Sequence, residues 1–115
     1  MASVSEIIVD TGPLVAFLVK TDGHHRWAVD RLRALPPPFF TCEPVLAEGA
    51  HLVRRVRHGL ERFVDLLMSD LLRVEFDVMG ERAAVGRLLR KYADTPMSLA
   101  DACLVRMAEL NDGAS

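Results

Sequence analysis

The feature that most constrains the fold is a short apolar run that ends in an acid. Ile7-Ile8-Val9 is followed directly by Asp10. A continuous β-branched run of this length is typical of a parallel strand buried on both faces. Gly12 permits a tight turn after it, and Pro13 suits the first position of a helix, which we expect over residues 14–19. A buried strand that leads at once into a helix predicts an α/β fold.

The rest of the chain continues this alternation of strands and helices. We expect further strands over residues 39–42 and 71–76, and helices over residues 24–35, 43 or 44 to about 57, 60–70, 80–92 and 98–110. Gly59 is expected to break the long third helix. Such alternation predicts a parallel sheet covered by helices. The 115 residues fit one domain, spanning residues 1–115.

The carboxyl-terminal end predicts an incomplete domain. The last expected helix runs into Asn111-Asp112-Gly113, which is how such a domain turns into its next strand. We therefore expect one or more carboxyl-terminal strands to be missing from this chain.

The composition favours a packed domain without a membrane anchor. Half of the residues are hydrophobic and 26% are charged, which excludes disorder as the main state. No apolar run approaches the roughly 18–20 residues that span a bilayer, and residues 1–6 lack the pattern of a signal peptide. Cys42 and Cys103 lie apart in apolar contexts, so we expect two buried thiols in a reducing compartment. A disulfide between them is the alternative.

The net charge of −2 does not by itself indicate a nucleic-acid-binding protein. Arginine nevertheless dominates the basic residues, and Arg54, Arg55, Arg57 and Arg62 lie close together. Guanidinium groups match phosphate geometry well. A solvated helix face explains this cluster equally well.

The carboxylates of Asp10 and Glu48 are candidates for a functional site. Asp10 directly follows an apolar strand, and Glu48 lies beside the apolar face of a helix. Asp10 ends the first strand, and open α/β sheets bind ligands at the carboxyl ends of their strands. Its alternative role is to cap the next helix. Glu48 lies at the edge of the apolar arc of its helix. Arg55 follows two turns later and lies on nearly the same side of that helix. Its alternative role is a surface salt bridge.

Asp101 has the strongest physical argument. The helix over residues 98–110 is apolar almost all round, so we expect it to be buried. A buried carboxylate must be paired, hydrogen-bonded or metal-bound. Ser98 and Asp101 also match a capping box, which would satisfy backbone N–H groups and is compatible with metal binding. Asp94 either reaches the same pocket or starts the turn before Pro96.

These acids predict a site for a hard divalent cation. Carboxylate oxygens suit Mg²⁺ or Mn²⁺, whereas no set of four nitrogen and sulfur ligands suggests structural zinc. The chain has neither a glycine-rich phosphate loop nor a nucleophile motif.

Three segments together resemble PIN domains. They are IIVDTGPLVAFL at residues 7–18, VLAEGAHL at residues 45–52 and YADTPMSLADACL at residues 92–104. Their order and spacing fit the three acidic segments of that family, and together they span most of the chain. The length resembles the small VapC-type toxins of bacterial toxin–antitoxin pairs.

The resemblance implies a three-layer α/β/α fold with a central parallel sheet. It also implies a cytoplasmic ribonuclease that hydrolyses RNA with Mg²⁺ or Mn²⁺ and acts as the toxin of a type II pair. It assigns catalysis and metal binding to Asp10, Glu48 and Asp101, with Asp94 as an auxiliary ligand. The implied reaction is attack on a phosphodiester by a metal-activated water. Thr11 would hydrogen-bond Asp10 or a metal-bound water, and Arg55 would contact phosphate or else pair with Glu48.

The resemblance also implies partners, and it leaves a rival function open. An antitoxin and a second copy of the chain are the expected protein partners. The apolar helix around Phe63, Leu66, Leu67 and Met68 would support dimerisation or would belong to the core. In the family a further Asp usually follows the next strand, and this sequence ends before it. The rival functions are therefore a PIN-like module that binds protein or RNA without cleaving, and a related phosphatase or DNase.

Overall fold

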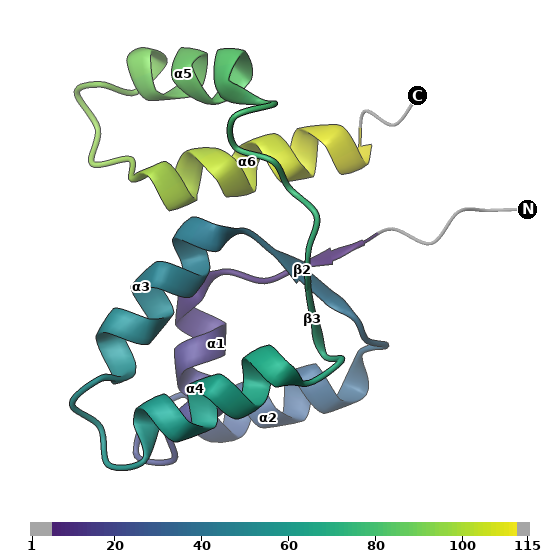
Figure 1. The fold of residues 1–115 in the computed structure, drawn as a ribbon, viewed down its shortest axis with the longest axis vertical. Helices are drawn as coiled ribbons and strands as arrows, with labels where there is room; N and C mark the ends of the chain where they lie inside the picture. Colours follow the sequence, from purple (N-terminus) through teal and green to yellow (C-terminus); the bar gives the residue numbers. More distant parts are fainter. Residues whose placement is uncertain (1–5, 113–115) are drawn as a thin grey trace, which may run out of the picture.

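The computed structural model describes residues 6–112, which form a parallel sheet flanked by helices (Figure 1). The strands are β1 (Ile7–Ile8), β2 (Phe39–Thr41) and β3 (Leu72–Val74). The helices are α1 (Thr11–Leu18), α2 (His25–Ala34), α3 (Glu43–Val53), α4 (Gly59–Met68), α5 (Arg82–Lys91) and α6 (Leu99–Asp112). The strand order is β1-β2-β3, with Ile7 opposite Phe39 and Phe39 opposite Leu72.

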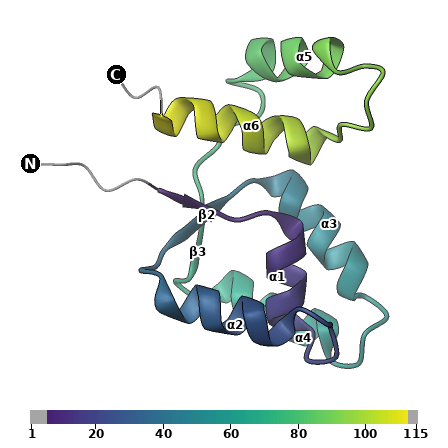
Figure 2. The same cartoon turned by 180° about the vertical axis from the view of Figure 1, so that it is seen from behind.

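The helices form layers on the two faces of this sheet. Helices α5 and α6 lie on one side, and α1, α2 and α4 lie on the other (Figures 1 and 2). Helix α3 stands at the carboxyl ends of the strands, where it packs against α1, α4 and α6. The predicted three-layer α/β architecture is confirmed. None of the described helices is both long and apolar enough to cross a membrane.

The core joins the sheet to α3 and α6. Its largest fully buried side chains are Thr41, Cys42, Val45, Val53 and Cys103. The Thr41 hydroxyl donates to the Val9 carbonyl oxygen at 2.8 Å, so this buried polar group is satisfied. Both cysteines are buried free thiols, as the sequence predicts.

Helix α1 begins earlier than its sequence suggests. Its first residue is Thr11, so Gly12 and Pro13 lie inside the first turn of the helix and do not form a separate turn. Pro13 is tolerated there because backbone N–H groups in the first turn have no partner within the helix. Asp10 is the N-cap, and its Oδ1 accepts a hydrogen bond from the Thr11 backbone N–H at 2.5 Å. The capping role considered for Asp10 is therefore present.

Helix α3 is shorter than predicted because a tight corner follows it. It ends at Val53, not near Arg57, and His58 takes a left-handed conformation with φ 60°. Gly59 then starts α4, and any Cβ at this position would overlap the Val53 carbonyl oxygen. A glycine is required here because the two helix ends approach each other closely.

Helix α6 is buried on one face only, which corrects the expectation of a fully buried helix. Ala100, Ala102, Cys103 and Met107 are buried, whereas Leu99, Val105 and Leu110 are exposed. The helix packs against α5, α3 and β1, and the remaining face meets solvent. Its apolar sequence therefore does not bury every side chain, and Asp101 lies among the exposed ones.

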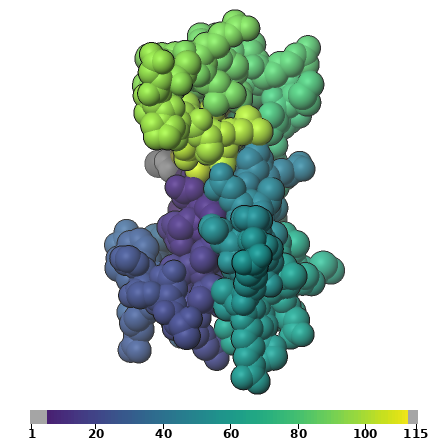
Figure 3. All heavy atoms as spheres, turned by 90° about the vertical axis from the view of Figure 1, so that its left-hand side faces the viewer, coloured from purple at the N-terminus to yellow at the C-terminus, as the bar shows by residue number. Residues whose placement is uncertain are grey.

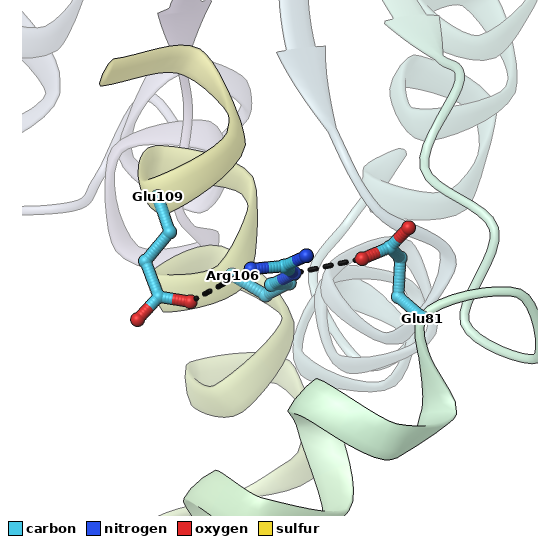
Figure 4. Close-up of polar contacts among 3 residues, drawn as sticks. All are labelled: Glu81, Arg106 and Glu109. Atoms are coloured by element: carbon cyan, nitrogen blue, oxygen red, sulfur yellow. Dashed lines mark hydrogen bonds and ion pairs between the residues drawn. The ribbon is translucent and has the colours of Figure 1, made fainter. Parts of the chain in front are cut away.

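Two side chains of α6, Arg106 and Asn111, attach this helix to distant parts of the chain. The Arg106 Nε donates to Glu81 Oε1 at 2.7 Å, and Nη1 donates to Glu109 Oε1 at 3.3 Å (Figure 4). The bond to Glu81 is the main cause of a raised pKa at the Arg106 guanidinium. Near the end of α6, the Asn111 side-chain amide accepts from the Glu6 N–H at 3.3 Å and donates to the Glu6 carbonyl oxygen at 3.4 Å. These contacts tie α6 to the start of α5 and to the first strand.

Candidate active site

The candidate site lies at the carboxyl ends of the strands, where three helices begin. Asp10 follows β1, and Cys42 at the end of β2 precedes α3. Figure 3 views the molecule from this side and shows α1 (purple), α3 (blue-green) and α6 (yellow-green) meeting near the middle of the molecule. The topology therefore brings the predicted acidic segments to one edge of the sheet.

Thr11 joins two of the predicted acids. Its backbone N–H donates to Asp10 Oδ1 at 2.5 Å, and its hydroxyl donates to Glu48 Oε2 at 2.9 Å. The Thr11 side chain is buried, whereas Asp10 and Glu48 are exposed. Each carboxylate is thus held by one hydrogen bond and keeps oxygen lone pairs available to solvent.

The thiol of Cys42 lies within electrostatic reach of both of these acids. Burial raises the pKa of the Cys42 thiol above its ordinary value, and the negative charges of Asp10 and Glu48 raise it further. A hydrogen bond with Cys103 acts in the opposite direction. The residues that follow β1 and β2 therefore meet side chains of α3 and α6 around the end of the central strand.

Asp101 takes the capping role that the sequence also allowed. The Ser98 N–H donates to Asp101 Oδ2 at 2.9 Å, and the Asp101 N–H donates to Ser98 Oγ at 3.0 Å. The prediction of burial was wrong, because Asp101 lies on the exposed face of α6. This reciprocal pair fixes the carboxylate in the first turn of the helix and leaves its other oxygen unoccupied by the cap.

The remaining predicted residues lie further from this arrangement. Asp94 is exposed in the turn between α5 and α6. Arg55 is exposed in the turn beyond Val53, so it no longer shares a helix with Glu48. Between residues 6 and 112 no ion pair joins Arg55 to Glu48.

The predicted carboxylate ligands have the chemistry that a hard divalent cation prefers. The fold brings only two of these four acids together. Asp10 and Glu48 offer carboxylate oxygens and are linked through Thr11. Across the described part of the chain, no group of three or more His, Cys, Asp or Glu side chains is arranged to hold a metal ion. The structure therefore presents an acidic pair, with Asp101 and Asp94 outside it.

A cleft beside Glu48 was not anticipated from the sequence. It has a volume of about 690 Å³ and lies between the start of α3, the segment after β3 and the first turn of α6. Asp77 in its wall comes soon after β3, much as Asp10 follows β1. Asp77 directly follows the expected strand 71–76, just as Asp10 follows the first expected strand. The same argument from sequence could therefore have identified Asp77 as a candidate site residue.

The family model for the PIN domain matches residues 7–114. The chain belongs to the PIN domain family. A solved structure of Mycobacterium tuberculosis VapC20, described as a Sarcin-Ricin loop cleaving toxin, superposes with a TM-score of 0.75 over 94% of this chain and 84% of that one. The two sequences are 24% identical, so this likeness establishes a shared fold. No curated protein matches the chain significantly.

Proposed function

We propose that this PIN domain is a divalent-metal-dependent ribonuclease and the toxin of a toxin–antitoxin pair. The observation that carries the proposal is the hydrogen-bonded arrangement of Asp10, Thr11 and Glu48 at the carboxyl edge of the sheet. Family membership supports the choice of nuclease chemistry. The VapC20 neighbour, itself described as a Sarcin-Ricin loop cleaving toxin, supports RNA as the substrate class and an antitoxin as the partner.

In this proposal, the candidate residues bind the metal ion, orient its ligands or contact the RNA. Asp10, Glu48 and Asp101, with Asp94 as an auxiliary, would hold Mg²⁺ or Mn²⁺, which when bound polarises phosphate and makes a water more acidic. Thr11 orients Glu48 through its hydroxyl and Asp10 through its backbone N–H. The Ser98 cap fixes Asp101. Arg55, exposed in the turn after α3, is free to contact a substrate phosphate.

The proposal includes a homodimer in the cytoplasm. Helix α4 presents a stripe of exposed apolar side chains, which we call the α4 stripe: Leu60, Val64, Leu67 and Met68. By contrast, Phe63 and Leu66 of the same helix are buried in the core. Of the helix residues considered for dimerisation, only Leu67 and Met68 are thus available to a partner.

Cleavage of RNA with Mg²⁺ or Mn²⁺ tests the function. We expect wild type to cleave RNA, and we expect Asp10→Asn and Asp101→Asn to lose at least about a hundredfold in rate, as removal of a charged ligand should do. Ser98→Ala is the matched control. It removes only the hydroxyl that accepts from the Asp101 N–H, whereas the Ser98 backbone N–H still holds the Asp101 carboxylate, so it should cleave RNA close to the wild-type rate. Equal cleavage by wild type and both Asp variants would refute the assignment. DNA and a phosphomonoester, assayed in parallel, separate ribonuclease from DNase and phosphatase activity.

A second candidate is a PIN-like module that binds protein or RNA without cleaving it. It is favoured by the lack of a three-acid metal-binding group within residues 6–112. Calorimetric titration with Mn²⁺ separates the two. The ribonuclease requires binding that Asp10→Asn abolishes, whereas the binding module predicts no carboxylate-dependent Mn²⁺ binding.

A further inference from the structure

The cleft beside Glu48 has walls from three elements that are distant in sequence. Glu48 on α3 belongs both to the cleft and to the acidic pair held by Thr11. The opposite wall is the segment after β3, which includes Asp77 and Met79, and Leu99 of α6 lies at the remaining side. A ligand seated there would lie directly beside the proposed cleavage site. Its volume of about 690 Å³ is in the range of small-ligand sites.

Large apolar side chains line this cleft in spite of their exposure. Met79 is 64% exposed and Leu99 is 45% exposed. A hydrated metal ion or a phosphate would gain nothing from such walls. A flat aromatic ring would gain from both, because apolar side chains pack on ring faces and methionine sulfur contacts aromatic systems favourably. The walls therefore favour a nucleobase over the phosphate backbone.

The two sides of the cleft are held in place by hydrogen bonds. Glu81 directly follows the segment that carries Asp77 and Met79, and it accepts the bond from Arg106 of α6 at 2.7 Å (Figure 4). The Glu81 N–H also donates to the Asp77 carbonyl oxygen at 2.9 Å. The Asp77 segment is thus fixed to the same helix that carries Leu99. A site formed in advance loses less conformational entropy when a ligand binds.

The charged side chains that line the cleft are the carboxylates of Glu43, Glu48 and Asp77, and only Asp77 comes from the wall opposite α3. Asp77 is an exposed carboxylate, and its Oδ2 lies so close to Gly80 that a Cβ there would meet it at 2.6 Å. An ionised carboxylate can only accept hydrogen bonds. The Watson–Crick edge of guanine presents two adjacent donors, N1–H and the N2 amino group, which match one carboxylate in a bidentate manner. Adenine and cytosine place an acceptor nitrogen beside their amino group, and uracil places its single donor between two carbonyl oxygens.

We infer that this cleft is a base-binding subsite of the proposed ribonuclease, and that Asp77 makes it prefer guanine. Asp77 is the specificity residue, and Met79 and Leu99 contact the ring faces. The inference rests on the proposed RNA-cleaving function, because it places the base next to the phosphate that Asp10 and Glu48 would face.

Binding of short single-stranded RNAs tests the inference separately from catalysis. The probes are uridine-rich RNAs with one central guanosine, inosine, adenosine or cytidine, measured by fluorescence anisotropy in Ca²⁺, with gels to check that they stay intact. Inosine lacks only the N2 amino group. We expect wild type to bind the guanosine RNA about tenfold more tightly than the inosine RNA, the size of one lost hydrogen bond to a charged group.

Substitutions at the cleft then assign the preference to a residue. We expect Asp77→Asn to bind the guanosine and inosine RNAs equally, and Met79→Ala to weaken binding of both. Asp70→Asn, the same change at an exposed acid before β3 that is outside the cleft, should keep the wild-type preference. Thermal unfolding checks that each variant is folded.

The outcomes separate this inference from the proposed function. Equal binding of guanosine and inosine RNAs by wild type, tightest binding of the adenosine or cytidine RNA, or a preference that survives Asp77→Asn would overturn the subsite. If the guanosine preference depends on Asp77 but Asp10→Asn still cleaves at the wild-type rate, the subsite stands and the proposed metal site fails.

Discussion

At the scale of single residues, Thr11 has the most consequential contacts in the candidate site. It is buried, and it donates to Asp10 through its backbone and to Glu48 through its hydroxyl. Thr11→Val keeps the shape of the side chain and removes only the hydroxyl. We expect it to lower kcat/KM for RNA at least about tenfold and the free energy of unfolding by about 1 kcal/mol.

The conservative control for this position is Thr11→Ser, which retains the hydroxyl and should retain most activity. Steady-state cleavage and urea unfolding are the two measurements. Full activity of Thr11→Val would show that orientation of Glu48 by this bond is unimportant.

The buried Cys103 thiol should make the fold less stable at alkaline pH. Burial raises the pKa of the Cys103 thiol to about 11, whereas the ordinary value is 9.0. The folded protein therefore holds this proton more tightly than the unfolded chain. Its contribution to stability is complete below pH 9 and is lost as pH rises toward about 11. Urea unfolding of wild type and Cys103→Ala across this window should show a steeper decline for wild type. Parallel curves would contradict the prediction.

The acids also show what sequence can and cannot predict about a site. Asp10 was correctly placed at the end of the first strand, because strand direction alone fixes which residue follows. The prediction that this strand is buried on both faces was wrong, since Ile7 and Ile8 are only half-buried. The bond from Thr11 to Glu48 joins residues 37 positions apart, and only the packing of α1 against α3 creates it. Asp101 was expected to be buried because its neighbours are apolar. Its exposure depends on which face of α6 the rest of the molecule covers, and one helix sequence does not determine that.

At the scale of elements, the corner between α3 and α4 is the sharpest constraint. Gly59 lies so close to the Val53 carbonyl that no side chain fits. We expect Gly59→Ala to lower the free energy of unfolding by about 2 kcal/mol or more, because the helix ends must separate. Urea unfolding is the measurement.

Gly86→Ala is the matched control for this substitution. Gly86 lies within α5, and a Cβ there would meet nothing within 4 Å. We expect this change to be neutral or to stabilise by up to about 1 kcal/mol, as alanine favours helix. Equal effects of the two substitutions would argue against the close approach at the corner.

Elements were predicted better than their ends. Each predicted helix and strand has a counterpart, because apolar periodicity fixes the type of element. The ends depend on contacts with the rest of the chain. Residues up to about Arg57 have a helical pattern, yet α3 stops at Val53 because the chain must turn for α4 to pack against it. For the same reason, the prediction that Glu48 and Arg55 lie on the same side of one helix was wrong.

At the scale of the whole molecule, the α4 stripe predicts self-association. We expect light scattering to report a dimer for wild type and a monomer for Val64→Asp, since a charge would have to be buried in the contact. Val64 is half exposed in the single chain, so the monomer's own stability should change by less than about 0.5 kcal/mol.

The matched control introduces the same charge elsewhere. Val105 on α6 is another exposed valine, and Val105→Asp should remain dimeric. A monomeric wild type would refute the dimer, and a dimer that survives Val64→Asp would place its interface away from the α4 stripe.

The contact between Asn111 and Glu6 has a consequence for behaviour in concentrated solution. In the described part of the chain β1 is an outer strand of the sheet, and such strands can recruit strands from other molecules. The Asn111 amide occupies both the N–H and the C=O of Glu6, as a neighbouring strand would. It thereby shields the beginning of this edge, and Asn111→Ala should aggregate faster than wild type when turbidity is followed during mild heating. One side-chain amide near the end of the last helix thus helps to keep separate molecules from joining their sheets.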